Sequence, residues 1–204
     1  RHRRATRSYK RIASNIVYKT EYGSAGEQKL YGIVQGGIYD DLREESIDFN
    51  INKINTFGIA IGGSLGSSKE EMYRVVNFTA PKLGNKHPIH LLGIGDPRDI
   101  WNLVKSGVDT FDCVSPTRLA RHGSALTKGK MGKINIKNKK YANQILPIDE
   151  TCNCPTCSKY SLAYIHHLFK AGELLGLQLV TPHNIFFMNK LMSTIRTSIE
   201  TDNL

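Results

Sequence analysis

Four short apolar segments, each rich in β-forming residues and each followed by glycine or a polar turn, most constrain how this chain can fold. They lie at residues 30–34, 57–61, 89–94 and 108–111. Helical patterns separate them at 40–54, 68–83 and 97–106. Parallel strands need a crossover, usually a helix, whereas antiparallel strands can be joined by a tight turn. The alternation therefore predicts an α/β fold with a parallel sheet whose strands are buried on both faces.

The turns after these segments favour one half of a (β/α)8 TIM barrel over the alternative, a doubly wound sheet. Loops after the strands build the site of a TIM barrel, and polar or glycine-rich turns are expected there. The turns read Gln35-Gly36-Gly37, Gly62-Gly63-Ser64, Gly93-Ile94-Gly95-Asp96-Pro97 and Asp112-Cys113. Half a barrel leaves open sheet edges. The chain also begins at Arg1 within a basic, helix-like stretch, so we expect it to be the C-terminal part of a longer protein that carries the rest of the barrel.

Composition narrows the function classes. The 204 residues are 40% hydrophobic, which is enough for a buried core, and no stretch approaches the roughly 20 apolar residues of a membrane span. The net charge of +10 favours a polyanionic partner such as nucleic acid, although a solvated basic surface is the alternative. From 118 to 141 the pattern changes to a predicted hairpin with a lysine-rich face, either for RNA or simply protecting an edge. Its lysines are Lys128, Lys130, Lys133, Lys137, Lys139 and Lys140.

Three of the four cysteines fall within six residues, as Cys152, Cys154 and Cys157. This spacing does not suit paired disulfides, and with no secretion signal it indicates a reducing cytoplasm and a metal rather than three free thiols. Zinc prefers four ligands in a tetrahedron, so a fourth must come from elsewhere. His166, His167 and His183 are the candidates. We favour His183, because it follows Pro182 at an expected helix start, and a filled shell of four makes the zinc structural.

The chain divides, on this interpretation, into 1–125, the half barrel, and 126–204, the hairpin, the zinc-binding subdomain and two C-terminal helices. The amphipathic pattern predicts these helices at 161–177 and 183–201, separated at Gly176 and Pro182. Asp112 follows the fourth strand. A carboxylate at a barrel strand end faces the mouth of the site, although an isolated Asp at this place can also be a turn or capping residue.

The segment 108–121, VDTFDCVSPTRLAR, resembles the catalytic segment of the tRNA-guanine transglycosylases, the bacterial queuine tRNA-ribosyltransferases. The cysteine loop with His183 is similar to the zinc motif of that family. Residues 31–37, 58–63 and 161–179 also match family segments, in order and with compatible spacing. The resemblance covers nearly the whole chain.

The resemblance implies a TIM barrel with a zinc-binding subdomain, and an enzyme that exchanges the wobble guanine of certain tRNAs for the queuosine precursor preQ1. Asp112 would be the nucleophile that attacks the ribose anomeric carbon and forms a covalent intermediate. Such a centre needs a carboxylate on one face, as in retaining glycosidases. The residues that match the base pocket are Gln35, Gly62, Gly63, Leu92 and Gly93. Those that match tRNA-contacting stretches are Gly93, Ile94, Gly95, Asp96, Pro97, Arg98, Asp99, Thr117, Arg118, Leu119, Ala120 and Arg121. The family also implies a homodimer.

The sequence departs from the family after Gly62-Gly63, where Ser64 replaces an apolar residue and the loop at 64–68 is shorter. This puts the choice of incoming base in doubt, and queuine or another tRNA position stays open. No position matches the family's general base or its second base-reading aspartate, so the chain alone is expected to be inactive. A zinc-dependent RNA-binding module without chemistry is the alternative from another class of function.

Overall fold

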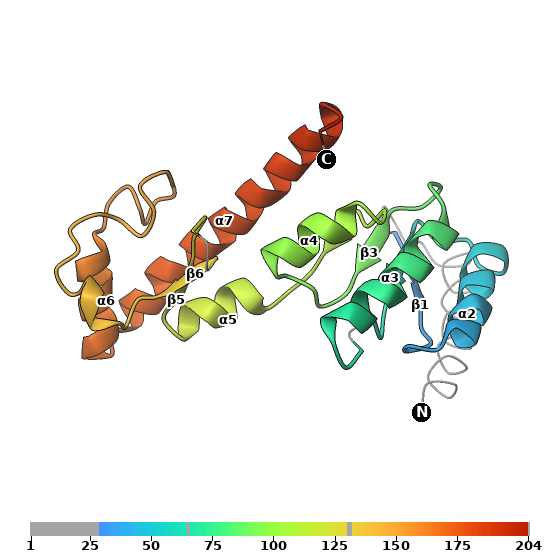
Figure 1. Cartoon of the computed structure of the whole chain (residues 1–204), viewed down its shortest axis with the longest axis horizontal. Helices are drawn as coiled ribbons and strands as arrows, with labels where there is room; N and C mark the ends of the chain where they lie inside the picture. The colour runs from blue at the N-terminus through green and yellow to red at the C-terminus, as the bar shows by residue number, and fades with distance from the viewer. Residues whose placement is uncertain (1–28, 65, 130–131, 204) are drawn as a thin grey trace. The chain divides into compact units, whose positions relative to one another are not determined.

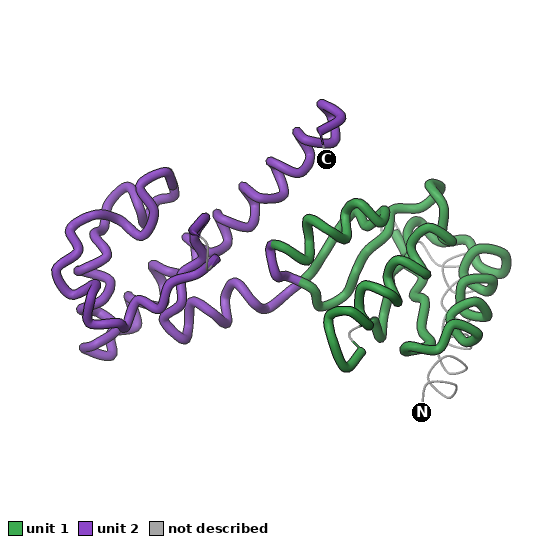
Figure 2. Tube along the Cα trace, viewed as in Figure 1, with its two compact units in different colours: residues 1–94, 98–112 green, residues 95–97, 113–204 purple. Residues whose placement is uncertain are grey.

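The computed structural model describes residues 29–64, 66–129 and 132–203, which form two compact units. The first contains residues up to Ile94 together with Arg98–Asp112, and the second contains Gly95–Pro97 and Cys113–Leu204 (Figure 2). The expected boundary, after residue 125, lies further along the chain than the observed one, after Asp112. The roles assigned to 1–125 and 126–204 stay predictions. The basic stretch at the N-terminus and Lys130 lie outside the described residues.

The first unit contains the predicted parallel sheet. Its strands are β1 (Tyr31–Val34), β2 (Gly58–Ile61), β3 (Ile89–Leu91) and β4 (Thr110–Phe111). They run in the order β1-β2-β3-β4, with Val34 paired to Ile61, Ile61 to Leu91 and Leu91 to Phe111. Figure 1 labels β1 and β3 of this sheet. The last residues of all four strands therefore form one row, and the residues that follow them start from the same edge. This confirms an α/β fold with a parallel sheet.

The expectation that every strand is buried on both faces was wrong for the outer strands. All four residues of β2 are buried, whereas Tyr31 of β1 and Thr110 of β4 are exposed. In the described sheet β1 and β4 each have one neighbour, so their side chains have less to pack against. The hydrophobic core of the unit is centred on β2 and β3, with Ile59, Ile61 and Leu91 inaccessible to solvent.

Helices follow the strands as predicted: α2 (Asp40–Asn52), α3 (Lys69–Leu83) and α4 (Pro97–Val104). α3 is capped at its N-terminus: the Ser68 hydroxyl accepts from the Glu71 amide, and the Glu71 carboxylate accepts from the amide and hydroxyl of Ser67, the residue before the cap. It ends at Gly84, whose φ of 66° suits glycine.

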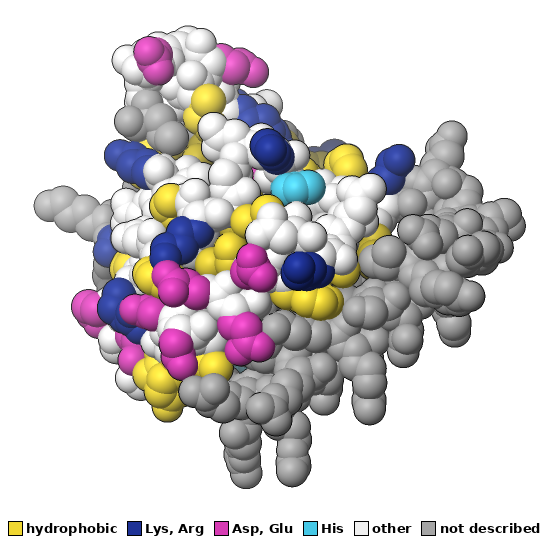
Figure 3. Space-filling model, turned by 90° about the vertical axis from the view of Figure 1, so that its right-hand side faces the viewer, with side chains coloured by type: hydrophobic (Ala, Val, Ile, Leu, Met, Phe, Trp, Pro, Cys, Tyr) yellow, Lys and Arg dark blue, Asp and Glu magenta, His cyan; other side chains and the backbone are white. Residues whose placement is uncertain are grey.

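Ion pairs join neighbouring helices of the first unit. Arg74 of α3 pairs with Asp40 of α2, and Lys82 pairs with Glu44 in the same way. In the side view of the space-filling structure, acidic and basic side chains lie close together (Figure 3). On the face shown there, the described residues form a mixed surface of both charges.

The second unit starts with a helix that sequence reasoning missed, α5 (Ser115–Arg121). The predicted hairpin is confirmed, with β5 (Ser124–Leu126) antiparallel to β6 (Lys133–Asn135). A 3-10 turn, η1 (Lys139–Tyr141), follows it. The five described lysines of the hairpin region are exposed, namely Lys128, Lys133, Lys137, Lys139 and Lys140.

The predicted break between the C-terminal helices was misplaced. α6 (Leu162–Ala171) ends at Gly172, whose φ is 74°, and α7 (Leu174–Glu200) continues through both Gly176 and Pro182. Gly176 is buried, and a Cβ there would lie 3.3 Å from Leu168 Cβ, so glycine allows α6 and α7 to approach closely. Pro182 has no backbone N–H, so it removes one hydrogen bond from α7. In the turn of α7 before Pro182, the Leu179 carbonyl accepts from the Thr156 hydroxyl at 2.7 Å.

Candidate functional site

The strand register brings four predicted site residues to one edge of the sheet. Gln35, Gly62, Leu92 and Asp112 each come directly after one residue of the row at the strand ends. Sequence spacing could only place each of them at the end of its own strand. The parallel register is what places an amide, a glycine backbone and a carboxylate along the same edge, as expected for a site at the carboxyl ends of parallel strands.

Asp112 is held in place but accessible. Its Oδ1 accepts from the Gly93 amide at 3.2 Å and lies 3.1 Å from His90 Nε2. The other nitrogen of His90 lies 2.9 Å from the Thr110 hydroxyl, so the imidazole bridges Thr110 of β4 and Asp112, which follows β4. The Asp112 side chain is still 60% exposed. A carboxylate oriented by one backbone amide and one imidazole, and open to solvent, is able to attack a bound electrophile.

Sequence reasoning did not single out His90. Its signal was weak, because a histidine inside a short apolar strand is as expected for packing as for function. The edge contact with Tyr31, with ring centroids 6.4 Å apart, supports a packing role as well. Only the pairing of β3 with β4 shows that its ring reaches Asp112.

The predicted base-pocket residues of the first two strand ends lie together. A Cβ added to Gly62 would lie 2.7 Å from the Gln35 amide nitrogen, and one added to Gly63 would lie 3.2 Å from the Gln35 amide oxygen. Gly63 also has a φ of 60°, which favours glycine. The two glycines therefore leave room for the Gln35 side chain, whose amide can both donate and accept hydrogen bonds.

The predicted tRNA-contacting stretch after β3 is mixed in exposure. Gly93, Asp96 and Arg98 are exposed, Pro97 is half-buried, and Ile94 and Gly95 are buried. Asp99 is also buried, and its carboxylate accepts from Lys69 at 2.9 Å and from the Tyr73 hydroxyl at 2.7 Å. These bonds join α4 to α3, so the side chain of Asp99 serves packing of the helices.

The second predicted stretch lies on α5. Arg118 and Arg121 are exposed, Thr117 and Leu119 are half-buried, and Ala120 is fully buried. The arginines therefore remain accessible to phosphates, which is the usual role of such side chains in RNA-binding proteins. The part played by each of these residues stays a prediction.

The four predicted metal ligands come together in the second unit. Their ligand atoms, the sulfurs of Cys152, Cys154 and Cys157 and a nitrogen of His183, all lie within 4.8 Å of one another. His183 Nδ1 lies 3.8, 3.5 and 3.3 Å from the three sulfurs in that order. Tetrahedral zinc with its usual bond lengths separates nitrogen from sulfur by about 3.6 Å. The residues present therefore fit zinc.

His183 is the correct fourth ligand, but not for the reason given by the sequence. It lies in the interior of α7 rather than at a helix start, and it is fully buried. His166 is buried on α6, where its Nδ1 lies 2.7 Å from the Ile136 carbonyl, and His167 is exposed. Both have the packing or surface roles expected of histidines that are not ligands.

Burial shifts the pKa values of ligands in this metal site. It lowers the pKa of His183, which favours the neutral imidazole that binds metals. Burial also raises the pKa of the Cys152 and Cys157 thiols, so without a metal they would stay protonated. A bound divalent cation reverses this preference because it takes up the thiolate. Metal binding and folding of this unit are therefore linked.

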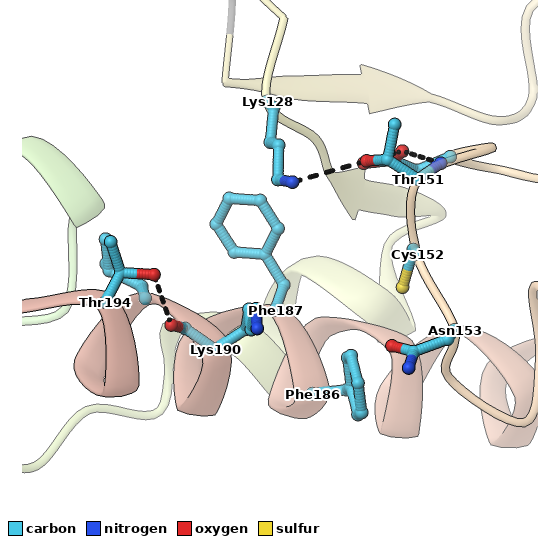
Figure 4. A pocket seen from close by; sticks show the side chains of 10 residues that line it. Lys128, Thr151, Cys152, Asn153, Phe186, Phe187, Lys190 and Thr194 are labelled. Carbon is cyan, nitrogen blue, oxygen red and sulfur yellow. Dashed lines mark hydrogen bonds between the residues drawn. The ribbon is translucent and has the colours of Figure 1, made fainter. Parts of the chain in front are cut away.

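Cys152 is the most accessible of the four ligands. It is half-buried and lines a pocket of about 220 Å³ with residues of the hairpin, the cysteine loop and α7 (Figure 4). On one side Lys128 donates to the Thr151 hydroxyl at 3.3 Å, and on the other Phe186 and Phe187 supply apolar surface. The pocket adjoins the metal site and so belongs to the same local structure.

Comparison with known proteins decides the family. The family model described as queuine tRNA-ribosyltransferase matches residues 1–204. The chain belongs to the queuine tRNA-ribosyltransferase family. The queuine tRNA-ribosyltransferase of Roseiflexus sp. (strain RS-1) is 49% identical over 174 residues, which are 84% of this chain and 43% of the relative. That of Clostridium acetobutylicum is 49% identical over 177 residues, covering 86% of this chain and 46% of the relative. That of Zymomonas mobilis is 43% identical over 187 residues, covering 91% and 48%.

This queuine tRNA-ribosyltransferase family member spans less than half the length of these curated relatives. Cys152, Cys154, Cys157 and His183 form one structural zinc site. Within the part of the chain that the structure describes, helices both long and apolar enough to cross a membrane are absent.

Proposed function

We propose that this family member is part of a tRNA-guanine transglycosylase, a pentosyltransferase of queuosine biosynthesis that replaces the wobble guanine of tRNA by preQ1. The observation that carries the proposal is the exposed carboxylate of Asp112, held by Gly93 and His90 at the same sheet edge as Gln35 and Gly62. Relatives that are 49% identical to this chain over 174 and 177 aligned residues carry the name queuine tRNA-ribosyltransferase, which supports the same reaction class.

The fold of the first unit is, on this proposal, the C-terminal half of a TIM barrel. Support comes from the strand order, in which chain order and spatial order are the same from β1 to β4. A doubly wound sheet reverses its strand order at a switch point, whereas a barrel does not. Residues 1–125 would then carry the catalytic segment, and residues 126–204 the hairpin, the zinc and the C-terminal helices.

The reaction follows from the chemistry of a carboxylate next to a sugar. Asp112 attacks the ribose anomeric carbon, the bond to guanine breaks with its electron pair leaving on the base, and a covalent ester between enzyme and RNA forms. Guanine takes up a proton as it leaves. PreQ1, after losing its proton, then attacks the same carbon and releases the Asp112 carboxylate. His90 and the Gly93 amide keep the attacking oxygen oriented.

Base recognition is assigned to Gln35, Gly62, Gly63, Leu92 and Gly93. The Gln35 amide offers a donor and an acceptor beside the backbone of the two glycines, which suits the edge of a purine. Contacts with tRNA are assigned to the stretches 93–99 and 117–121, with the exposed Arg98, Arg118 and Arg121 as the cationic side chains. The partners are therefore tRNA, guanine and preQ1. A homodimer and a reducing cytoplasm complete the proposal.

Base exchange in the complete protein tests this function. Purified protein and tRNA are incubated with labelled guanine or labelled preQ1, and the label retained in tRNA is measured. Replacing Asp112 by Asn should abolish incorporation, because the amide is not a nucleophile, whereas the exposed control Asp48→Asn should leave it unchanged. Incorporation by Asp112→Asn at the wild-type rate would remove Asp112 from this role.

Trapping separates the enzyme from the alternative of a zinc-dependent RNA-binding module. An enzyme with a covalent intermediate should give a protein–RNA complex that survives denaturing electrophoresis. Binding of tRNA without incorporation and without a trapped complex would favour the binding module. Preference for queuine over preQ1 in the same assay would instead change only the identity of the base.

A further inference from the structure

Arg43 of α2 is the most unusual charged residue of the first unit. Its side chain is fully buried, and in the described residues no ion pair joins it to a carboxylate. Instead it donates to backbone carbonyls, from Nε to Gly37 at 2.6 Å and from Nη2 to Gly62 at 2.9 Å and Gly63 at 3.1 Å. Its Nη1 is buried and has no hydrogen-bond partner in the described part of the chain.

Burying this charge opposes folding. Desolvation lowers the pKa of Arg43 to about 10, although the guanidinium remains protonated at neutral pH. A buried charge without a counter-ion is costly, and an apolar residue of similar volume is often at least as stabilising. The cost has to be offset by something that only a guanidinium can do here. The three carbonyls show what this is, because they belong to the turns after β1 and β2.

Those two turns contain glycines, so their own sequence does little to hold them in one conformation. Gly37 and Gly63 have φ values of 61° and 60°, and glycine is the residue with the greatest backbone freedom. One planar fork that donates to both turns fixes them relative to each other. A lysine ammonium is a compact point charge and does not reproduce this fork.

The direction of the carbonyls also sets the direction of backbone donors. A trans peptide group is planar, and its C=O and N–H point in opposite directions. Because the Gly62 and Gly63 carbonyls face Arg43, the N–H groups of Gly63 and Ser64 face away from it. Within the described residues neither N–H donates to a protein acceptor. They leave two backbone donors in the turn whose Gly62 and Gly63 adjoin the Gln35 amide.

We infer that Arg43 is a positioning residue for base recognition: it holds the carbonyls of Gly37, Gly62 and Gly63 so that the N–H groups of Gly63 and Ser64 and the Gln35 amide are presented together. The ligand they suit is a planar heterocycle with acceptors along one edge, such as a purine or deazapurine. This inference rests on the proposed function, and it assigns Arg43 a role in binding the base and not in binding tRNA.

Steady-state exchange by the complete protein tests it. Arg43→Lys should raise the KM for guanine by about tenfold or more, the effect of losing one charge-assisted hydrogen bond. The KM for tRNA should stay within about twofold. Arg74→Lys is the matched control, since Arg74 likewise donates to a backbone carbonyl after β1, that of Ile38, but is exposed and paired with Asp40. It should leave both KM values unchanged.

The outcomes separate this inference from the proposed function. If the wild-type protein exchanges no base, the proposed function fails and the inference with it. If the wild type is active and Arg43→Lys keeps the wild-type KM for guanine, the inference alone is wrong. An equal rise in the KM for tRNA would also overturn it, because that indicates a general loss of structure.

A measurement on the wild-type protein decides the matter if Arg43 variants do not fold. Hydrogen–deuterium exchange is followed with and without guanine. Guanine should slow exchange in peptides that cover 36–38 and 62–64, the turns that Arg43 joins. It should leave exchange at 84–87, before β3 at the opposite ends of the strands, unchanged. Equal exchange rates in the two turns with and without guanine, in protein shown to incorporate guanine into tRNA, would contradict the inference and leave the proposed function standing.

Discussion

The imidazole of His183 connects the metal site to the hairpin through Leu126. His183 Nε2 lies 2.9 Å from the Leu126 carbonyl oxygen, while Nδ1 faces the three sulfurs. A carbonyl can only accept, so Nε2 carries the proton and Nδ1 keeps its lone pair for the metal. The next residue, Asn184, accepts from the Leu126 amide at 2.8 Å. Two adjacent residues of α7 thus satisfy both backbone groups of one residue of β5.

Replacing Asn184 by Ala should destabilise the second unit by about 2–4 kcal/mol. The buried amide group accepts from Leu126 and donates to the carbonyls of Pro116 and Ser124, so its removal leaves several backbone groups without partners. Urea unfolding of the complete protein measures the effect. Asn52→Ala, which removes one exposed bond to Asp48, is the control and should change stability by less than about 0.5 kcal/mol.

Replacing Cys154 by Ala should remove the zinc. Cys154 is fully buried and packs in the hydrophobic cluster formed by α6, α7 and the hairpin, so both the metal and this cluster lose a member. Metal analysis should find about one zinc per wild-type chain and close to none in the variant, with earlier thermal unfolding. Cys113→Ala should keep its zinc. Full zinc occupancy in the Cys154 variant would contradict the assigned ligand set.

His90→Ala should lower the rate of base exchange by about 10- to 100-fold, the effect expected for losing a hydrogen bond to a charged group. The loss should fall on kcat, because His90 lies 3.1 Å from the Asp112 carboxylate and orients it. His87→Ala is a suitable control, since His87 belongs to the turn before β3 at the other end of the strand. Separate measurement of kcat and KM tests this prediction. A kcat equal to that of the wild type would exclude a role of His90 in orienting Asp112.

The hydrogen bonds between Ser67 and Glu71 at the start of α3 should contribute to stability only above acid pH. Hydrogen bonds from the Ser67 amide and hydroxyl lower the pKa of Glu71 from its ordinary value of 4.5. A depressed folded-state pKa means stability that is present above pH 4.5 and is lost as the pH falls through the folded value. Glu71→Gln should therefore be less stable than wild type at pH 7, and the difference should shrink toward pH 3. Urea midpoints at the two pH values measure this.

The strands, most helices and the metal site could be predicted from the sequence, because the patterns that indicate them are local. Apolar runs followed by glycine or a polar turn predicted β1 to β4, and the helical patterns between them predicted α2, α3 and α4 within a few residues. The three cysteines predicted a zinc site from spacing alone. Glycine and proline were less reliable as boundary markers. The end of α6 is at Gly172, while Gly176 and Pro182 lie inside α7, because packing against α6 and the cysteine loop decides whether a helix continues there.

Which distant side chains act together depends on how the elements pack and pair. The register of the sheet places Gln35, Gly62 and Asp112 along one edge, and the pairing of β3 with β4 brings His90 to Asp112. The buried guanidinium of Arg43 and the bonds of Asn184 were not visible in the sequence, since a residue type does not reveal whether its side chain points to water or to a backbone turn. Hydrogen bonds between residues far apart in the chain form only once packing has brought those residues together.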